Sequence, residues 1–388
     1  MATKKAPKEI VCWKKFSSDD WRILISAQPQ FIDKCSWSDL DFGDLVEVLL
    51  AQPGLVENCR AALQNTSWGR FDDLRLAMAY PQYADECDIA AKDGSAWRQA
   101  LLWGSGLDDK CDWAKLSKMD WVMVLGKRPE LFPKCSTSML DGDSWRRILE
   151  KHPELACDEA WEKMSASEKA IVLAVAPEFS SQCEWKDVEG FAWAILLAKQ
   201  PQFADKCDWS KFETDPYSGD SDWTILLAVQ PHFSEKCDLL ALNAENTVEI
   251  LKAQPQLFDN CNVDQLEGEH WAALLSAQPQ LADKCDWAKI GRFDWCDLLA
   301  AQPQFIDRCQ FSNIEGVQRV LKAHPELADK WELSCMSPGQ WAELLSEQPQ
   351  FAEKFQIDWK KFKPQEWVTL LVKQPQFAMP SGTAPSAN

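Results

Sequence analysis

Apolar and polar positions along this chain recur with a period of 24 residues. Each copy carries a tryptophan or another apolar residue, two apolar residues three and four positions later, and a proline eight positions after the first. In one well-preserved copy these residues are Trp193, Leu196, Leu197 and Pro201. Apolar residues at i, i+3 and i+4 predict an amphipathic α-helix. We therefore expect each copy to open with a helix of about ten residues that ends before the proline.

The prolines and tryptophans define the number of copies. Most steps between successive prolines are 24 residues, Pro81 follows a four-residue insertion, and Ser105 stands where one proline is missing. A repeat of this kind is one structural unit that buries its apolar face against its neighbours. The remaining prolines are Pro29, Pro53, Pro129, Pro153, Pro177, Pro201, Pro231, Pro255, Pro279, Pro303, Pro325, Pro349 and Pro375, which makes fifteen units with Pro81 and Ser105.

The part of each copy after the proline is too short for a second full helix. Common helical repeats with two helices need about 33 residues or more, so 24 residues leave room for one α-helix and short 3-10 or single-turn pieces. The pattern predicts an all-α fold, a right-handed α-solenoid of about fifteen repeats. We expect a continuous solenoid over residues 12–378, a flexible tail at 1–11 and a disordered tail at 379–388.

The motif after each helix resembles a known sequence repeat. Its form Gln-Pro-Gln-Phe-Ala-Asp-Lys-Cys-Asp-Trp is clearest at residues 200–209 and is similar to a tandem repeat of uncharacterised bacterial proteins. The alternation of one α-helix with a short helical piece resembles the leucine-rich repeat variant class of α-solenoids. The first resemblance implies no activity. The second class lacks this tryptophan and cysteine signature, so it implies no iron-sulfur ligand here, and we expect no cofactor.

The net charge of the chain indicates which kinds of partner it can bind. The formal net charge is −19, and binding to nucleic acid or to anionic lipid needs clustered lysine and arginine. No run of 18 apolar residues occurs, and the start of the chain shows no apolar export segment. We therefore expect a cytoplasmic protein that binds a protein or peptide, contacts neither nucleic acid nor membrane directly, and is a monomer.

The cysteines and histidines follow the repeat. Eleven of the 15 cysteines recur at one repeat position without any close Cys-x-x-Cys pair, which favours packing of free thiols over metal or disulfide chemistry. Two of the four histidines, His152 and His324, stand where glutamine precedes the proline in other copies. Motifs for phosphate loops, serine hydrolases and zinc proteases are missing from the sequence. We expect no catalytic residue, no metal site and no enzyme.

Two positions of the repeat, one polar and one aromatic, can each be interpreted in two ways. The glutamine before the proline is expected to bond helix carbonyls or to form a stacked amide ladder, and the alternative is a polar stripe that binds an extended peptide. The phased tryptophans are expected to pack in the core, and the alternative is a stacking platform. They are Trp21, Trp97, Trp121, Trp145, Trp193, Trp223, Trp271, Trp295, Trp341 and Trp367.

Candidate partner-binding residues lie where the chain departs from the repeat. One insertion, residues 213–220, carries Asp215, Tyr217 and Asp220, and another near residues 64–71 carries Trp68 out of phase. Insertions in solenoids form loops on one face and often bind partners. The regular spacing of a calcium loop is absent from the first insertion. A basic stretch with Arg146 and Arg147, together with Lys127, Arg128, Lys151 and His152, is either a site for an acidic peptide or a solvated face.

These observations favour a non-enzymatic scaffold for protein–protein interaction, which binds a peptide or protein along the surface of the solenoid. One alternative is an acidic mimic of nucleic acid that inhibits a basic nucleic-acid-binding protein. Another is a structural array that associates with itself.

Overall fold

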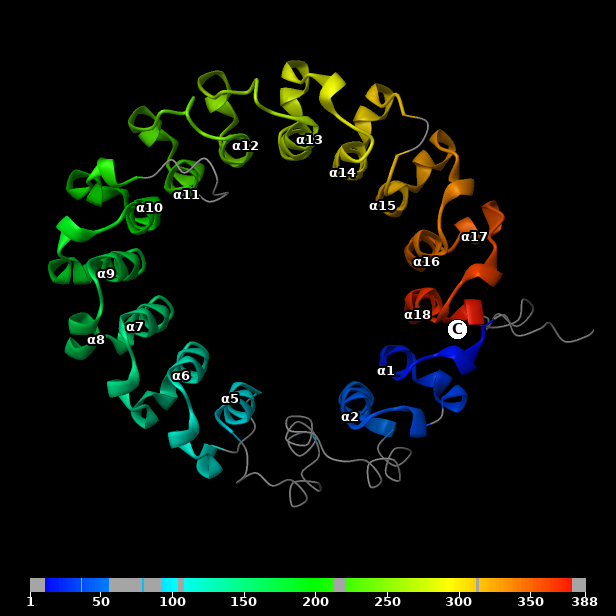
Figure 1. The fold of residues 1–388 in the computed structure, drawn as a ribbon, viewed down its shortest axis with the longest axis horizontal. Helices are drawn as coiled ribbons and strands as arrows, with labels where there is room; N and C mark the ends of the chain where they lie inside the picture. The colour runs from blue at the N-terminus through cyan, green and yellow to red at the C-terminus, as the bar shows by residue number, and fades with distance from the viewer. Residues whose placement is uncertain are drawn as a thin grey trace, which may run out of the picture. The chain divides into compact units, whose positions relative to one another are not determined.

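The fold consists of helices and connecting turns. A computed structural model describes residues 11–35, 37–55, 79, 93–103, 108–212, 221–311 and 314–378, and no strand occurs in these ranges. The helices pack in chain order against their neighbours (Figure 1). The prediction of an all-α solenoid of repeats is confirmed. Within the described ranges, no helix is long and apolar enough to span a membrane.

The α-helices are short. Those that open a repeat have seven to ten residues, close to the length expected from the apolar pattern. The described helices are α1 (Ser18–Ala27), α2 (Phe42–Ala51), α5 (Gly94–Trp103), α6 (Lys118–Leu125), α7 (Gly142–Leu149), α8 (Asp158–Lys163), α9 (Ala166–Leu173), α10 (Gly190–Lys199), α11 (Asp222–Val229), α12 (Ala244–Ala253), α13 (Gly268–Ala277), α14 (Asp294–Ala301), α15 (Val317–Ala323), α16 (Pro338–Glu347), α17 (Phe351–Lys354) and α18 (Pro364–Lys373).

Short 3-10 helices fill the rest of the repeat. The repeat proline stands at the first position of one of them, where its missing amide hydrogen costs nothing. These are Pro29–Lys34, Pro53–Leu55, Pro129–Lys134, Pro153–Leu155, Pro177–Gln182, Pro201–Lys206, Pro231–Lys236, Pro255–Asn260, Pro279–Lys284, Pro303–Arg308, Pro325–Lys330 and Pro375–Ala378. A second set precedes the next α-helix: Trp13–Lys15, Trp37–Asp39, Trp113–Lys115, Thr137–Met139, Trp185–Asp187, Trp209–Lys211, Trp287–Lys289, Leu333–Cys335 and Trp359–Lys361, with Asp108–Lys110 lying just before one of them.

The chain divides into two compact units. One consists of residues 90–294, and the other of residues 1–89 together with 295–388. In the unit of residues 90–294 the helices α5, α6, α7 and α9 to α13 form one row, and the 3-10 helices with α8 form a second row. The α-helical row lies on the concave side of this unit (Figure 1).

The core between the two rows is built from tryptophan and leucine. Trp193 is fully buried, as are Leu196 and Leu197, which confirms the interpretation of the phased tryptophans as core residues. A second tryptophan from the short 3-10 helix stacks on the first: the rings of Trp185 and Trp193 have centroids 5.5 Å apart. The same stacking joins Trp13 to Trp21, Trp113 to Trp121, Trp209 to Trp223 and Trp359 to Trp367.

Helix α1 shows how the α-helices begin. The aspartate before the phased tryptophan is easily taken for the helix cap, but Ser17 caps α1, and Asp20 lies at the third helical position and accepts from the Ser17 amide at 2.9 Å. Ser117 and Asp120 form the same reciprocal pair in α6. This capping box satisfies two donors that a helix start leaves free.

Where glutamine precedes the repeat proline, it joins one repeat to the preceding one. Its side-chain amide donates to a carbonyl near the end of the α-helix of the preceding repeat, where backbone acceptors lack a partner. Its own carbonyl oxygen accepts from the glutamine after the proline, as in Gln256 to Gln254 at 2.8 Å. The pairs are Gln52 to Ser26, Gln200 to Ala174, Gln230 to Ala198, Gln254 to Ala228, Gln278 to Lys252, Gln348 to Lys322 and Gln374 to Ser346.

We expect Gln254→Ala to lower the free energy of unfolding by about 1 kcal/mol, because it removes two hydrogen bonds and leaves the part-buried Ala228 carbonyl and the exposed Gln256 amide without their partner. Urea denaturation followed by circular dichroism measures this change. Gln356→Ala is the control, since Gln356 is exposed and outside the motif. Equal stability of the two variants would contradict a structural role for the motif.

The predicted tails and insertions lie almost wholly outside the described residues. Val11 is the exception in the proposed flexible segment 1–11, and it is buried. The insertions at residues 64–71 and 213–220 and the tail 379–388 are outside the described ranges. The predictions for the two insertions and for the tail 379–388 therefore stay predictions.

Candidate functional site

The side of the α-helices that points away from the row of 3-10 helices is called the open face here. It carries exposed apolar side chains in one part of the unit of residues 90–294. Val175 follows α9, Phe191 lies on α10 and Val229 on α11, with exposed fractions of 37%, 51% and 58%. Ile195 and Ile225 are half-buried between them. The three helices are neighbours in the row. We call these five side chains the apolar stripe.

The spacing along α10 explains why the stripe is exposed. Phe191 and Ile195 are four residues apart and so lie on one side of the helix. Trp193, Leu196 and Leu197 point to the opposite side and are buried. The stripe is therefore distinct from the core positions of the same helix.

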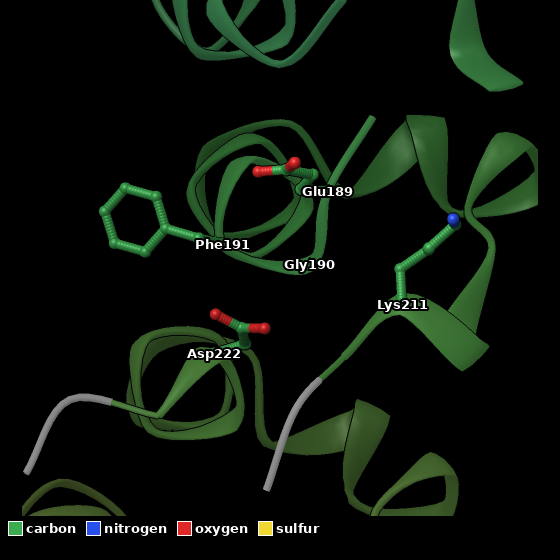
Figure 2. Close-up of a pocket in the computed structure, with 5 residues that line it drawn as sticks. All are labelled: Glu189, Gly190, Phe191, Lys211 and Asp222. Atoms are coloured by element: carbon green, nitrogen blue, oxygen red, sulfur yellow. The ribbon is translucent and has the colours of Figure 1, made fainter. Parts of the chain in front are cut away.

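A cavity of about 420 Å³ lies beside the stripe, at the beginning of α10 and α11. It is lined by Glu189, Gly190, Phe191, Lys211 and Asp222 (Figure 2). Phe191 projects away from α10, whereas Lys211 stands on the side of the 3-10 helices. The cavity thus joins an aromatic ring to two carboxylates and one ammonium group.

Gly190 brings the two repeats close together at this cavity. A β-carbon at this position would lie 2.2 Å from Oδ2 of Asp222 and 2.3 Å from the carbonyl oxygen of Lys211. Real β-carbons do not approach heavy atoms so closely, so only glycine fits without a shift of one repeat against the other. The close approach also places the Asp222 carboxylate at the start of α10, where negative charge is favourable.

The open face becomes acidic beyond the stripe. Glu245 and Glu249 on α12 and Glu269 on α13 occupy the same open positions as Phe191 and Ile195 on α10. Glu249 pairs with Lys252 on its own helix at 2.7 Å, and Glu245 lies 3.8 Å from Nε2 of His270. The apolar stripe is thus continued by a surface with an excess of carboxylates.

The basic stretch predicted as an alternative site is occupied by ion pairs. Arg146 contacts Asp143 at 2.6 Å and Glu150 at 2.8 Å, and Arg147 contacts Asp143 at 2.8 Å. The hydrogen bond from Arg146 lowers the pKa of Asp143 below its usual value. Both guanidinium groups on α7 already have carboxylate partners, and the role of Arg146 and Arg147 in binding stays a prediction.

Two neighbouring basic residues of that stretch, Arg128 and His152, are paired in the same way. Arg128 holds both carboxylate oxygens of Asp108, at 2.9 and 2.6 Å, and lowers the pKa of that carboxyl. His152 Nδ1 lies 3.0 Å from Glu154. The other candidate residues, Trp68, Asp215, Tyr217 and Asp220, lie outside the described residues.

The cysteines within the described ranges are free thiols, and all of these except Cys12 and Cys335 are buried or half-buried. Burial raises the pKa of Cys207, Cys237 and Cys285 to about 12 in each case. At neutral pH these thiols are protonated and therefore poor nucleophiles and metal ligands. In the part of the chain that the structure describes, no group of three or more His, Cys, Asp or Glu side chains is placed to hold a metal ion.

The apolar stripe was not among the residues singled out from the sequence. The available signal was an apolar residue two positions before or six positions after the phased tryptophan, as in Phe191 and Val229, since the core pattern does not require one there. No protein-family model, curated protein or solved structure matches this chain, so the two resemblances found in the sequence stay predictions.

Proposed function

We propose that this chain is a non-enzymatic scaffold that binds a protein or peptide along the open face of its α-helices, with the apolar stripe as the centre of the site. One observation carries the proposal: three neighbouring helices expose Val175, Phe191 and Val229 on one face, at positions that the core does not use. Exposed apolar side chains gathered on one face are typical of interaction sites. Covering it stabilises a complex by roughly 25 cal/mol per Å² of apolar area.

The charge beside the stripe indicates the chemistry of the partner. Glu245, Glu249 and Glu269 continue the open face, and the whole chain has a net charge of −19. Opposite charge increases the rate of association and excludes acidic competitors. We therefore propose a partner segment that combines apolar side chains with lysine or arginine. The Phe191 ring suits an apolar side chain of the partner, and the carboxylates of the adjoining cavity suit its lysine or arginine.

Selection from a random linear peptide library tests this proposal. The full chain is expected to enrich peptides that carry both apolar and basic residues. The variant Phe191→Asp with Val229→Asp is expected to bind the same peptides at least roughly 30-fold more weakly, because two anchoring contacts of about 1 kcal/mol or more are lost. Both side chains are more than half exposed, so the fold should be unchanged.

The matched control is Leu240→Asp. Leu240 is 63% exposed but lies in the turn before α12, away from the stripe. Circular dichroism checks that all variants keep their helix content. The proposal fails if no peptide is enriched, or if the enriched peptides bind the double variant as tightly as the control.

A further inference from the structure

The repeat that begins at Cys12 packs on the repeat that contains α18. Helices α1 and α18 are neighbours, and both belong to the same compact unit (Figure 1). The side-chain amide of Gln28 donates to the Val372 carbonyl at 2.6 Å. This is the bond that Gln52 makes to Ser26 and Gln374 makes to Ser346 between repeats that follow one another in the chain. The contact therefore has the geometry of an ordinary repeat interface without a peptide connection.

A cavity of about 390 Å³ lies at this contact, and lysines from both sides line it. Lys15 comes from the 3-10 helix before α1, and Lys360, Lys361 and Lys363 come from the segment before α18. Aromatic side chains form the rest of the wall, and no aspartate or glutamate contributes to it. A wall of this charge is unexpected in a chain with a net charge of −19.

The equivalent cavity between α10 and α11 has the opposite balance. There, Lys211 lines the cavity together with two carboxylates, those of Glu189 and Asp222. Glu189 stands at the N-cap position of α10, and Lys363 occupies the corresponding position of α18. Among the described α-helices whose capping residue is defined, α18 alone has a basic one.

A lysine at this position has a cost, since its ammonium group cannot accept a hydrogen bond from the first helical turn and lies at the positive end of the helix dipole. Departures from a local rule are concentrated at functional sites. The position of Lys363 thus supports a role beyond packing.

Three of the four lysines form no ion pair with a carboxylate of the described residues. Among the described residues, Lys361 Nζ lies 3.6 Å from Asp358, whereas the ammonium groups of Lys15, Lys360 and Lys363 form no ion pair. Glu366 accepts from the backbone amide of Lys363, at 2.8 Å, and not from its side chain. Lysines from both sides of the contact therefore line one cavity, and their like charges oppose the contact in the absence of an anion.

We propose that this cavity binds a compact anion of the polyphosphate class, and that the anion fastens the repeat of Cys12 to α18. The anion forms charge-assisted hydrogen bonds to Lys15 on one side and to Lys360 and Lys363 on the other. It binds only when both sides are together, so binding and docking stabilise each other. The cavity volume is in the range typical of small-molecule sites, about 300 to 1,000 Å³, and suits a triphosphate chain that is either free or carried by a nucleotide.

Calorimetry with the full chain tests the binding. Sodium tripolyphosphate is the probe, and sodium chloride at the same ionic strength shows the effect of screening alone. We expect one binding site per chain. The variant Lys360→Glu with Lys363→Glu is expected to bind roughly 100-fold more weakly, while Lys186→Glu with Lys199→Glu, which makes the same charge change on exposed residues elsewhere, binds normally.

Titration with ATP distinguishes the two sources of the anion: tighter binding of ATP assigns the site to a nucleotide, and equal binding assigns it to free polyphosphate.

Hydrogen exchange tests whether the anion stabilises the contact between the repeat of Cys12 and α18. At a tripolyphosphate concentration of 100 times Kd, the amides of α1 are expected to exchange roughly 100-fold more slowly than in sodium chloride, if exchange requires the two repeats to separate. Lys15→Gln, which adds no new attraction, should reduce this protection together with the affinity. The proposal is overturned if sodium chloride protects α1 equally, if tripolyphosphate does not bind, or if the charge-reversed variant binds it as the control does.

Discussion

Replacing Trp193 by alanine is expected to lower the free energy of unfolding by about 3 to 5 kcal/mol, the range for removing a large aromatic side chain from a closed core. Trp193 is fully buried and stacks on Trp185. Each repeat contacts only its neighbours, so the unit of residues 90–294 has few other contacts that could compensate for the cavity. The loss should therefore be local and large.

Chemical denaturation followed by far-ultraviolet circular dichroism measures this loss. Trp193→Phe is the informative second variant, because the indole N–H of Trp193 is buried without a hydrogen-bond partner among the described residues. Phenylalanine removes that unsatisfied donor and keeps most of the apolar contact, so it should cost less than half as much as alanine. A loss below about 1 kcal/mol for the alanine variant would show that the tryptophan row does not form the core.

The second large effect is expected at Gly268, where Gly268→Ala should lower the free energy of unfolding by about 2 to 3 kcal/mol. The added β-carbon would lie 2.3 Å from the carbonyl oxygen of Lys289 and 2.5 Å from Oδ2 of Asp294. Because one of these atoms belongs to the backbone, a change of side-chain rotamer cannot relieve the contact. The repeat of α13 and the repeat that follows it must move apart.

Gly339→Ala is the matched control for this glycine. Gly339 lies in the first turn of α16, and the nearest atom to an added β-carbon is Ser337 Oγ at 4.0 Å. Alanine favours a helix over glycine by up to about 1 kcal/mol, so this variant should be as stable as the parent chain or more stable. If both substitutions change the midpoint of urea denaturation equally, close approach at Gly268 does not determine the repeat spacing.

The structure shows which features the sequence could predict. The burial of the tryptophan and leucine positions follows directly from helical periodicity. Their spacing places all three residues on one side of the helix, whatever the neighbouring repeat is. The carbonyl that accepts from the side-chain amide of Gln254, and from the equivalent glutamines, cannot be predicted from periodicity. It depends on how one repeat is stacked on another. The start of α1 is also hard to predict, because Asp20 directly precedes the phased Trp21 but lies at the third helical position, and the cap is Ser17.

The candidate site was less predictable than the fold. Attention to the insertions and to Arg146 and Arg147 followed from composition and position, whereas the apolar stripe requires the side chains of three consecutive helices to be placed on one face. The cavity beside Lys363 depends on a contact between repeats that are far apart in the sequence. Periodicity identifies each repeat but carries no information about such a contact.

Hydrogen exchange of the chain with and without a selected basic and apolar peptide tests the central claim most directly. The account predicts slower exchange in α9, α10 and α11 when the peptide is bound, with no change in α16, and loss of this footprint in the variant Phe191→Asp with Val229→Asp. A footprint confined to the 3-10 helical side, or one that persists in the double variant, would contradict binding on the open face.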